Sequence, residues 1–270
     1  MKKNLLIVSL SLLLFISCGS DSDETQVQGV SDPTTFLPLA NGNYWTYDVD
    51  NDANNPGPLG RDSLYVANDT VVNSVTYKKM KTRAIPTGFF STSLRNNAVK
   101  IDQFKLLING TFNFDFGLTT PISIALNDFI FFKENAATNE VLSTTSGTIN
   151  QTIQNIPLVI DYKLSSVANG SLPLYILPNG DDYTGIRKTK VVLNLKITTQ
   201  QTISGIPVTV TIMPAQDVIV STQYYTGNTG MIYANTVLNY QLNTIPGVTL
   251  PIPASGNQTQ EEFLKTFVAN

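Results

Sequence analysis

The chain has 270 residues, of which 42% are hydrophobic and 14% are charged, and its formal net charge is -3. This is the composition of a globular protein and is too apolar for a disordered chain. The sequence has no histidine, which excludes Ser-His-Asp triads, His-ligated metals and imidazole general bases. Because Cys18 is the single cysteine, internal disulfides, thiolate zinc sites and iron–sulfur clusters are excluded as well.

Residues 1–17 have the features of a secretory signal peptide. Lys2 and Lys3 form a short positive region, and a nearly uninterrupted apolar run, Leu5–Ile16, follows. As a helix this run would rise roughly 18 Å, well short of the ~30 Å hydrocarbon core of a bilayer. The segment therefore predicts a signal peptide rather than a transmembrane helix.

The apolar run ends at Ser17-Cys18. A small residue before a lone cysteine resembles the bacterial lipobox, in which the cysteine is lipidated and becomes the mature N-terminus, although Phe15 replaces the usual Leu. An ordinary signal peptide followed by an incidental cysteine is the alternative. Since the only cysteine falls at the expected cleavage site, we expect Cys18 to be lipidated and to hold the protein on a membrane.

Residues 18–32 are expected to form the lipidated cysteine and an acidic tether. The segment Gly19–Glu24 resembles the acidic tract after the lipidated cysteine in surface-exported lipoproteins of Bacteroidota. The resemblance implies an outer-membrane lipoprotein exposed at the cell surface, and a plain solvated linker is the alternative. Removal of residues 1–17 leaves a net charge of -3 - 2 = -5, which gives no footprint for a nucleic-acid partner.

Residues 33–270 are expected to form a single all-β domain, because no internal linker interrupts a pattern of period two. The clearest strand has alternating apolar residues at Val191, Leu193, Leu195 and Ile197. Similar alternation runs through Leu158–Tyr162, Val208–Ile212, Val218–Tyr224 and Leu238–Leu242, with Val218, Val220, Thr222 and Tyr224 sharing one face. This pattern indicates antiparallel strands with one buried and one solvated face. We predict a mainly β fold, a single curved antiparallel sheet in the form of a half-barrel or open barrel with few helices.

Tight turns and one ambiguous segment complete the predicted elements. Turn dipeptides occur at Asn109-Gly110, Asn169-Gly170 and Asn179-Gly180, and Gly227–Gly230 is typical of a hairpin loop. Near the C-terminus, Thr259 and Glu262 have the spacing of a helix capping box before Phe263. A strand is almost as well supported there.

Two segments carry a resemblance to known proteins. Phe36-Leu37-Pro38-Leu39 with Gly42-Asn43-Tyr44-Trp45-Thr46-Tyr47, and Gln223-Tyr224-Tyr225 with the glycines that follow, resemble the two ends of many Bacteroidota lipoproteins of unknown function. The resemblance implies a curled half-barrel similar to the periplasmic lipoprotein-carrier proteins, which hold acyl chains. It assigns no catalytic residue.

Phenylalanines gather between residues 104 and 132. Alternation places Phe112, Phe114 and Phe116 on one face of a strand. One interpretation is a pocket for a hydrophobic or lipidic ligand, lined by Phe112, Phe114, Phe116, Phe129 and Phe131. An ordinary hydrophobic core is the alternative and is commoner for such clusters.

Catalytic and metal-binding patterns are weak. No motif pairs two carboxylates as a glycosidase would require. Asp48, Asp50 and Asp52 have the spacing of a calcium loop, but Ala53 stands where glycine is expected and the closing Glu is missing. Asp62-Ser63-Leu64 and Asp69-Thr70-Val71 resemble a short O-glycosylation sequon of Bacteroidota. We expect no catalytic residue, no metal site and no cofactor.

Three functions remain open. The first is a lipid-anchored cell-envelope β-protein that binds a hydrophobic or lipidic ligand. The second is a non-enzymatic interaction or scaffolding module whose protein partner the sequence does not identify. The third and least favoured is a carboxylate-based glycan hydrolase, so we do not expect an enzyme.

Overall fold

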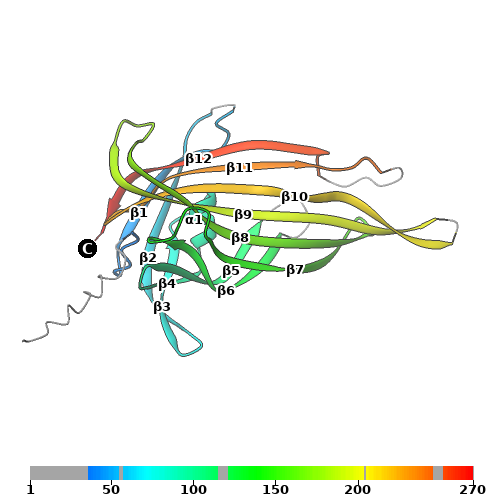
Figure 1. The fold of residues 1–270 in the computed structure, drawn as a ribbon, viewed down its shortest axis with the longest axis horizontal. Helices are drawn as coiled ribbons and strands as arrows, with labels where there is room; N and C mark the ends of the chain where they lie inside the picture. The colour runs from blue at the N-terminus through cyan, green and yellow to red at the C-terminus, as the bar shows by residue number, and fades with distance from the viewer. Residues whose placement is uncertain (1–35, 55–56, 115–120, 204, 246–251, 270) are drawn as a thin grey trace, which may run out of the picture. The chain divides into compact units, whose positions relative to one another are not determined.

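The computed structural model describes residues 36–269 apart from 55–56, 115–120, 204 and 246–251, and residues 32–270 form one compact unit. The described residues form one twelve-stranded antiparallel sheet that is nearly closed into a barrel, with one short helix (Figure 1). The prediction of a mainly β, curved antiparallel sheet with few helices is confirmed. The elements are β1 (Tyr44–Asp50), β2 (Gly60–Val72), β3 (Val75–Thr82), α1 (Phe89–Leu94), β4 (Ala98–Asp102), β5 (Lys105–Phe114), β6 (Ile122–Lys133), β7 (Val141–Ile153), β8 (Ile156–Ile176), β9 (Asp182–Ile203), β10 (Ile206–Thr226), β11 (Gly230–Gln241) and β12 (Ser255–Val268).

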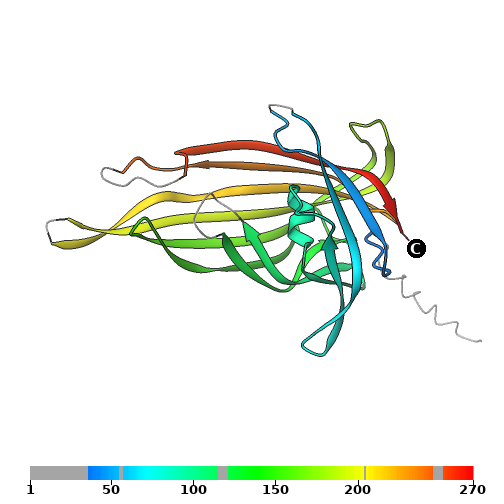
Figure 2. The ribbon, with the colours of Figure 1, turned by 180° about the vertical axis from the view of Figure 1, so that it is seen from behind.

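The strand order brings the first and last strands together. The order across the sheet is β6-β5-β4-β3-β2-β1-β12-β11-β10-β9-β8-β7, so only the β1–β12 pair joins strands that are distant in sequence. The two edge strands, β6 and β7, are therefore consecutive along the chain, and the sheet curls until these edges approach each other (Figures 1 and 2). The Ser166 hydroxyl of β8 donates a hydrogen bond across this seam to the carbonyl oxygen of Ile130 in β6.

The alternation predicted for β9 is confirmed, whereas in β10 the residues Val218, Val220, Thr222 and Tyr224 do not keep to one buried face. Val191, Leu193, Leu195 and Ile197 are all buried in the core. In β10 the register shifts between Asp217 and Ile219, and this irregularity changes which residues face the core. Val218 and Ile219 are both buried, and after them the buried positions are Ser221, Gln223 and Tyr225, while Val220, Thr222 and Tyr224 are half-buried.

Two of the predicted tight turns are also wrong. Asn179-Gly180 does form the turn between β8 and β9, and residues 227–229 join β10 to β11. Asn109-Gly110 instead lies within β5 and Asn169-Gly170 within β8. Gly110 (φ 142°) and Gly170 (φ 76°) occupy left-handed conformations at register shifts of these strands, so the dipeptides form β-bulges.

The C-terminal segment is the strand β12, and the helix considered for it is wrong. β12 lies between β1 and β11, and it pairs with β11 from Ser255 to Phe263 and with β1 from Glu261 to Val268. These two ladders of backbone hydrogen bonds outweigh the local helix-capping signal at Thr259 and Glu262. Glu262 still caps a helix, but that helix is α1.

Helix α1 lies inside the sheet (Figure 2). Its Phe90 ring lies 5.8 Å from Tyr47 of β1, 6.2 Å from Tyr225 of β10 and 6.3 Å from Phe131 of β6, measured between ring centroids. Because these three strands belong to different parts of the wall, the helix fills the interior at this level. The side chains of Phe90 and Leu94 are fully buried.

The end of the sheet at which the chain enters β1 is closed by aromatic side chains. The Trp45 indole N–H donates to the carbonyl oxygen of Thr229 (2.5 Å), and the Tyr47 hydroxyl donates to that of Met231 (3.1 Å). Both side chains are fully buried. Trp45 is therefore a core anchor whose polar atom is satisfied, as expected for a buried Trp.

Candidate ligand pocket

A pocket of about 250 Å³ lies between α1 and the strands β5, β10, β11 and β12. Its apolar wall contains Phe89, Phe112, Phe114, Ile219 and Leu238. The rings of Phe89 and Phe112 meet edge to face, with centroids 5.7 Å apart. Alternation along β5 aims Phe112 and Phe114 at the same side, which is why both reach the pocket.

Uncharged polar side chains complete the lining. They are Thr87, Thr92, Ser93, Asn113, Thr236, Gln258 and Gln260. Gln260 is held in place by α1, since its Oε1 accepts from the Phe89 N–H (2.7 Å) and its Nε2 donates to the Thr87 carbonyl (2.9 Å). None of the described lining residues is an Asp, Glu, Lys or Arg. The pocket therefore suits an uncharged ligand with a substantial apolar part.

The structure brings together some of the five phenylalanines that the sequence suggested as a pocket. Phe112, which is buried, and Phe114, which is half-buried, line the pocket. Phe129 and Phe131 are buried in the core and are not part of the lining. Phe116 lies outside the described residues, as does Cys18.

Two buried carboxyl groups, Asp62 of β2 and Glu262 of β12, hold the N-terminal end of α1. The Thr87 and Gly88 N–H groups donate to Asp62 at 3.0 and 2.7 Å. The Phe90 N–H donates to Glu262 Oε1 at 2.6 Å, and the Ser91 N–H donates to Oε2 at 3.5 Å. The two side chains thus satisfy the backbone donors that every helix leaves free at its N-terminus.

The Glu262 carboxyl group has a strongly raised pKa. The pKa is raised to about 8, with burial as the largest cause; the nearby Asp62 carboxylate acts in the same direction, while the Phe90 and Ser91 hydrogen bonds act in the opposite direction. Burial also raises the pKa of Asp62, against the Thr87 and Gly88 N–H donors. A raised carboxyl pKa is a common mark of catalytic sites. Here neither carboxyl lines the described pocket, and both bind backbone groups of the α1 segment.

Sequence reasoning missed the role of these two acids. Asp62 was interpreted as part of a glycosylation sequon and Glu262 as the cap of its own segment. The available signal was an acid on an inward face, since Asp62 alternates with Leu64 and Val66 in β2. Such a residue needs a buried partner, but its partner, the α1 segment, could not be identified from spacing.

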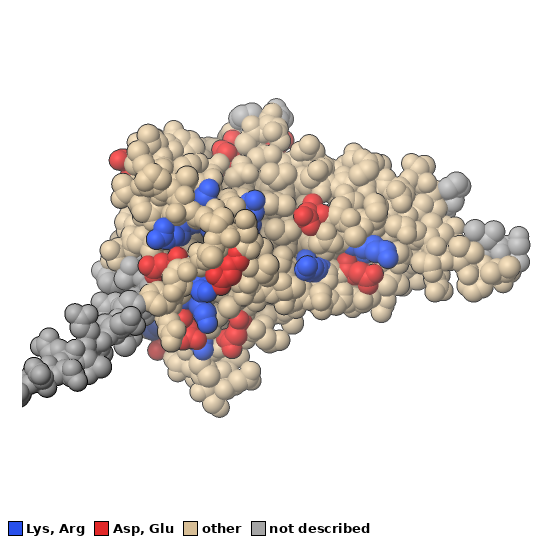
Figure 3. Space-filling model, viewed as in Figure 1, with Lys and Arg blue, Asp and Glu red and all other residues tan. Residues whose placement is uncertain are grey.

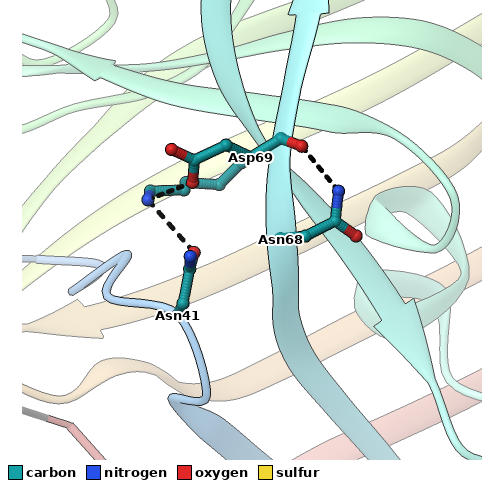
Figure 4. Close-up of polar contacts among 4 residues, drawn as sticks. Asn41, Asn68 and Asp69 are labelled. Carbon is teal, nitrogen blue, oxygen red and sulfur yellow. Dashed lines mark hydrogen bonds and ion pairs between the residues drawn. The ribbon is translucent and has the colours of Figure 1, made fainter.

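The second sequon lies on the outer surface at the β2–β3 hairpin. Asp69 forms an ion pair with Lys78, whose ammonium also donates to Asn41 Oδ1 at 3.1 Å (Figure 4). The hydrogen bond from Lys78 lowers the pKa of Asp69. Nothing in this arrangement tests glycosylation of Thr70, which stays a prediction.

One acid of the calcium-like segment is paired with an arginine of the same chain. Arg61 Nε donates to Asp48 Oδ1 at 2.6 Å, so this carboxylate already has a cationic partner. Among the residues that the structure describes, no three Asp, Glu, His or Cys side chains group as metal ligands. Within the same part of the chain, no helix is both long and apolar enough to cross a bilayer.

Comparisons with known proteins give one similar structure. No protein-family model matches the chain, and no curated protein matches it. A structural comparison finds the crystal structure described as "a putative lipoprotein from Parabacteroides distasonis ATCC 8503", at 2.70 Å resolution. The match covers 88% of this chain and 100% of that chain, with 12% sequence identity and a TM-score of 0.35. At this level of similarity, the likeness does not identify the function of the chain.

Proposed function

We propose that this protein is a lipid-anchored component of the bacterial cell envelope that binds a small, uncharged, largely apolar ligand inside its barrel. The observation that carries the binding function is the pocket beside α1, where Phe89, Phe112 and Phe114 meet and no charged side chain contributes to the described lining. Pockets of this composition are the usual sites of small apolar ligands. The anchor rests on the sequence around Cys18.

The size of the pocket limits what it accepts. About 250 Å³ is near the lower end of the range for small-molecule sites, which is roughly 300–1,000 Å³. A compact ligand, or one end of an acyl chain, fits this volume better than a whole phospholipid. The amide and hydroxyl groups of Gln258, Thr92 and Thr236 supply hydrogen-bonding partners for a neutral polar group on such a ligand.

The envelope location follows from the N-terminal segment. The run Leu5–Ile16 before Ser17-Cys18 supports export and lipidation, and the acidic Gly19–Glu24 tract supports an outer-membrane lipoprotein at the cell surface. Expression of Cys18→Ala in the native host should yield an unlipidated protein that a carbonate wash releases from membranes. A variant that stays in the washed membrane fraction, as wild type does, would contradict the anchor.

Ligand binding is tested with wild type, Phe114→Asp and the matched control Phe267→Asp. Phe114 lines the pocket, whereas Phe267 of β12 is exposed and lies outside the lining. Protein from the native host should carry an extractable apolar molecule, detected by mass spectrometry, and Phe114→Asp should lose it because a charge enters an apolar wall. Phe267→Asp should retain it. A folded wild type without a bound molecule, and without affinity for an apolar fluorescent probe, would leave the interaction module as the better hypothesis.

A further inference from the structure

A two-stranded arm projects from the sheet at the end opposite Trp45. The last β8–β9 register pair is Leu158 with Thr199, and the last contacts from the β11 side reach Thr211 and Ile212 through Asn243. Beyond these residues β9 and β10 pair only with each other, through Gln200–Thr202 and Ile206–Val210. We call these two segments the β9–β10 arm, and Figures 1 and 2 both show it extending past the neighbouring strands.

The arm exposes aliphatic side chains. Ile206 is 64% exposed and Val208 is 38% exposed, and Pro207 between them is also exposed. An isolated two-stranded ribbon is only marginally stable in water, so ordering these side chains without a partner is unusual. Proteins commonly protect such free strand edges with lysine or other charges. The arm has none.

The absence of charge extends to the segments beside the arm. The sequence has no Asp, Glu, Lys or Arg in 197–216, which includes the arm, nor in the neighbouring hairpin 141–160 or in 218–260. On the face shown in Figure 3, the charged residues stop well before the tip of β9 and β10. Thr, Gln and Asn occupy the positions where soluble proteins carry charged groups.

This pattern matches a lipid surface better than a protein partner. Protein interfaces combine an apolar centre with a polar rim and often place arginine among their contacts. A bilayer disfavours every charged side chain that approaches its acyl region, so an arm without charged residues is what contact with lipid requires. Because the arm has no cationic residue, it offers no attraction to anionic headgroups, which points to a neutral, zwitterionic surface.

We propose that the β9–β10 arm docks on a lipid bilayer through Ile206 and Val208, whose side chains enter the boundary between headgroups and acyl chains. The contact is shallow. Both edges of the arm present backbone N–H and C=O groups without strand partners, and such groups must stay hydrated. The contact requires neither lipidation of Cys18 nor an occupied pocket, so it stands apart from the function proposed above.

The test uses residues 19–270, which contain the whole compact unit and no cysteine. Flotation with neutral phosphatidylcholine vesicles should show binding by wild type. Ile206→Asp should lower the partition coefficient at least about tenfold, because one buried aliphatic side chain is replaced by a charge. The matched control is Ile176→Asp, since Ile176 is 60% exposed in the β8–β9 hairpin at the opposite end of β9. This control should bind as wild type does.

A second measurement locates the contact. An environment-sensitive fluorophore on Ile206→Cys should shift to shorter wavelength when vesicles are added, and the same label on Ile176→Cys should not. Equal shifts, or equal loss of binding in the two Asp variants, would overturn the proposal. Absence of vesicle binding by wild type would also overturn it. Sedimentation could also show that wild type self-associates and that Ile206→Asp abolishes this self-association. That result would overturn the proposal as well, because the arm would then bind a second copy of the chain rather than lipid.

Discussion

The two ends of the barrel are built from the same long strands but have different interiors. At the α1 end, rings close the space between the walls, and Phe132 lies 4.4 Å from Tyr225 and 5.5 Å from Phe36 between centroids. Beyond α1 the interior opens into the pocket beside Phe112 and Phe114, and farther along the wall ends in the uncharged arm. The difference shows that alternation in a strand sets which side chains face inward and leaves open whether the interior they face is filled.

The α1 end is filled by one short helix that contacts the surrounding strands. Six residues of helix have no independent stability. Its N-terminal donors bind Asp62 and Glu262, which lie on β2 and β12. The same segment supplies Thr87 and Phe89 to the pocket. The α1 segment therefore contributes both to the packing of the α1 end and to the shape of the pocket.

Phe90→Ala should produce the largest effect and shows directly how the two ends differ. Removing this fully buried ring from between Tyr47 and Tyr225 should lower the free energy of unfolding by about 3–5 kcal/mol. Phe114→Ala, at the half-buried pocket wall, should cost clearly less in urea denaturation followed by circular dichroism. Equal losses would mean that the interior is packed alike at both ends.

Gly88→Ala tests the close approach of the α1 segment to Glu262. A Cβ at position 88 would lie 2.1 Å from Glu262 Oε2 and 2.8 Å from Cγ, so the carboxyl must leave the helix donors that it binds. We expect a loss of about 1–3 kcal/mol in the free energy of unfolding, as for other overpacked sites. Gly57→Ala is the control, because nothing lies within 4 Å of its added Cβ. A stability equal to that of this control would contradict the capped geometry.

Glu262→Gln should flatten the dependence of stability on pH. The folded state holds the Glu262 pKa near 8, above its ordinary value of 4.5, so between these values the folded protein retains a proton that the unfolded chain has lost. Stability should therefore fall as pH rises from about 4.5 to 8, by up to about 1.4 kcal/mol per pH unit. The raised pKa of Asp62 acts in the same direction. Denaturation curves at pH 5, 6.5 and 8 that keep the full slope in Glu262→Gln would assign it to another group.

The sequence predicted the strands and their sheet because period-two alternation is a local property. It could not predict the bulge after Asp217, which reverses the inward face of β10, since a bulge depends on how neighbouring strands pair. The sequence Asn109-Gly110 is suited to a turn or to a bulge, and only the pairing of β5 with β6 decides between them.

The candidate site was predictable only in part. The alternation of Phe112 and Phe114 correctly placed two rings on one face, and the structure shows them beside the pocket. Helix α1 left no amphipathic pattern in six residues, so the opposite wall of the pocket, Thr87 and Phe89, could not be inferred. Because this wall could not be predicted, the sequence around Phe112 and Phe131 did not show that Phe112 lines a pocket and that Phe131 lies in the core.

Asp69→Asn should change the stability least of these variants. It tests whether surface ion pairs, rather than interior packing, stabilise the protein. The Asp69–Lys78 ion pair joins β2 and β3 on the outer surface. The Asp69 carboxylate is largely exposed, and water and salt screen such a pair. Although its pKa is lowered by Lys78, the loss of the pair should leave the unfolding midpoint at pH 7 within experimental error of wild type. A midpoint shift as large as that of Gly88→Ala would mean that surface ion pairs, rather than the capped and packed α1, distinguish the two ends of the barrel.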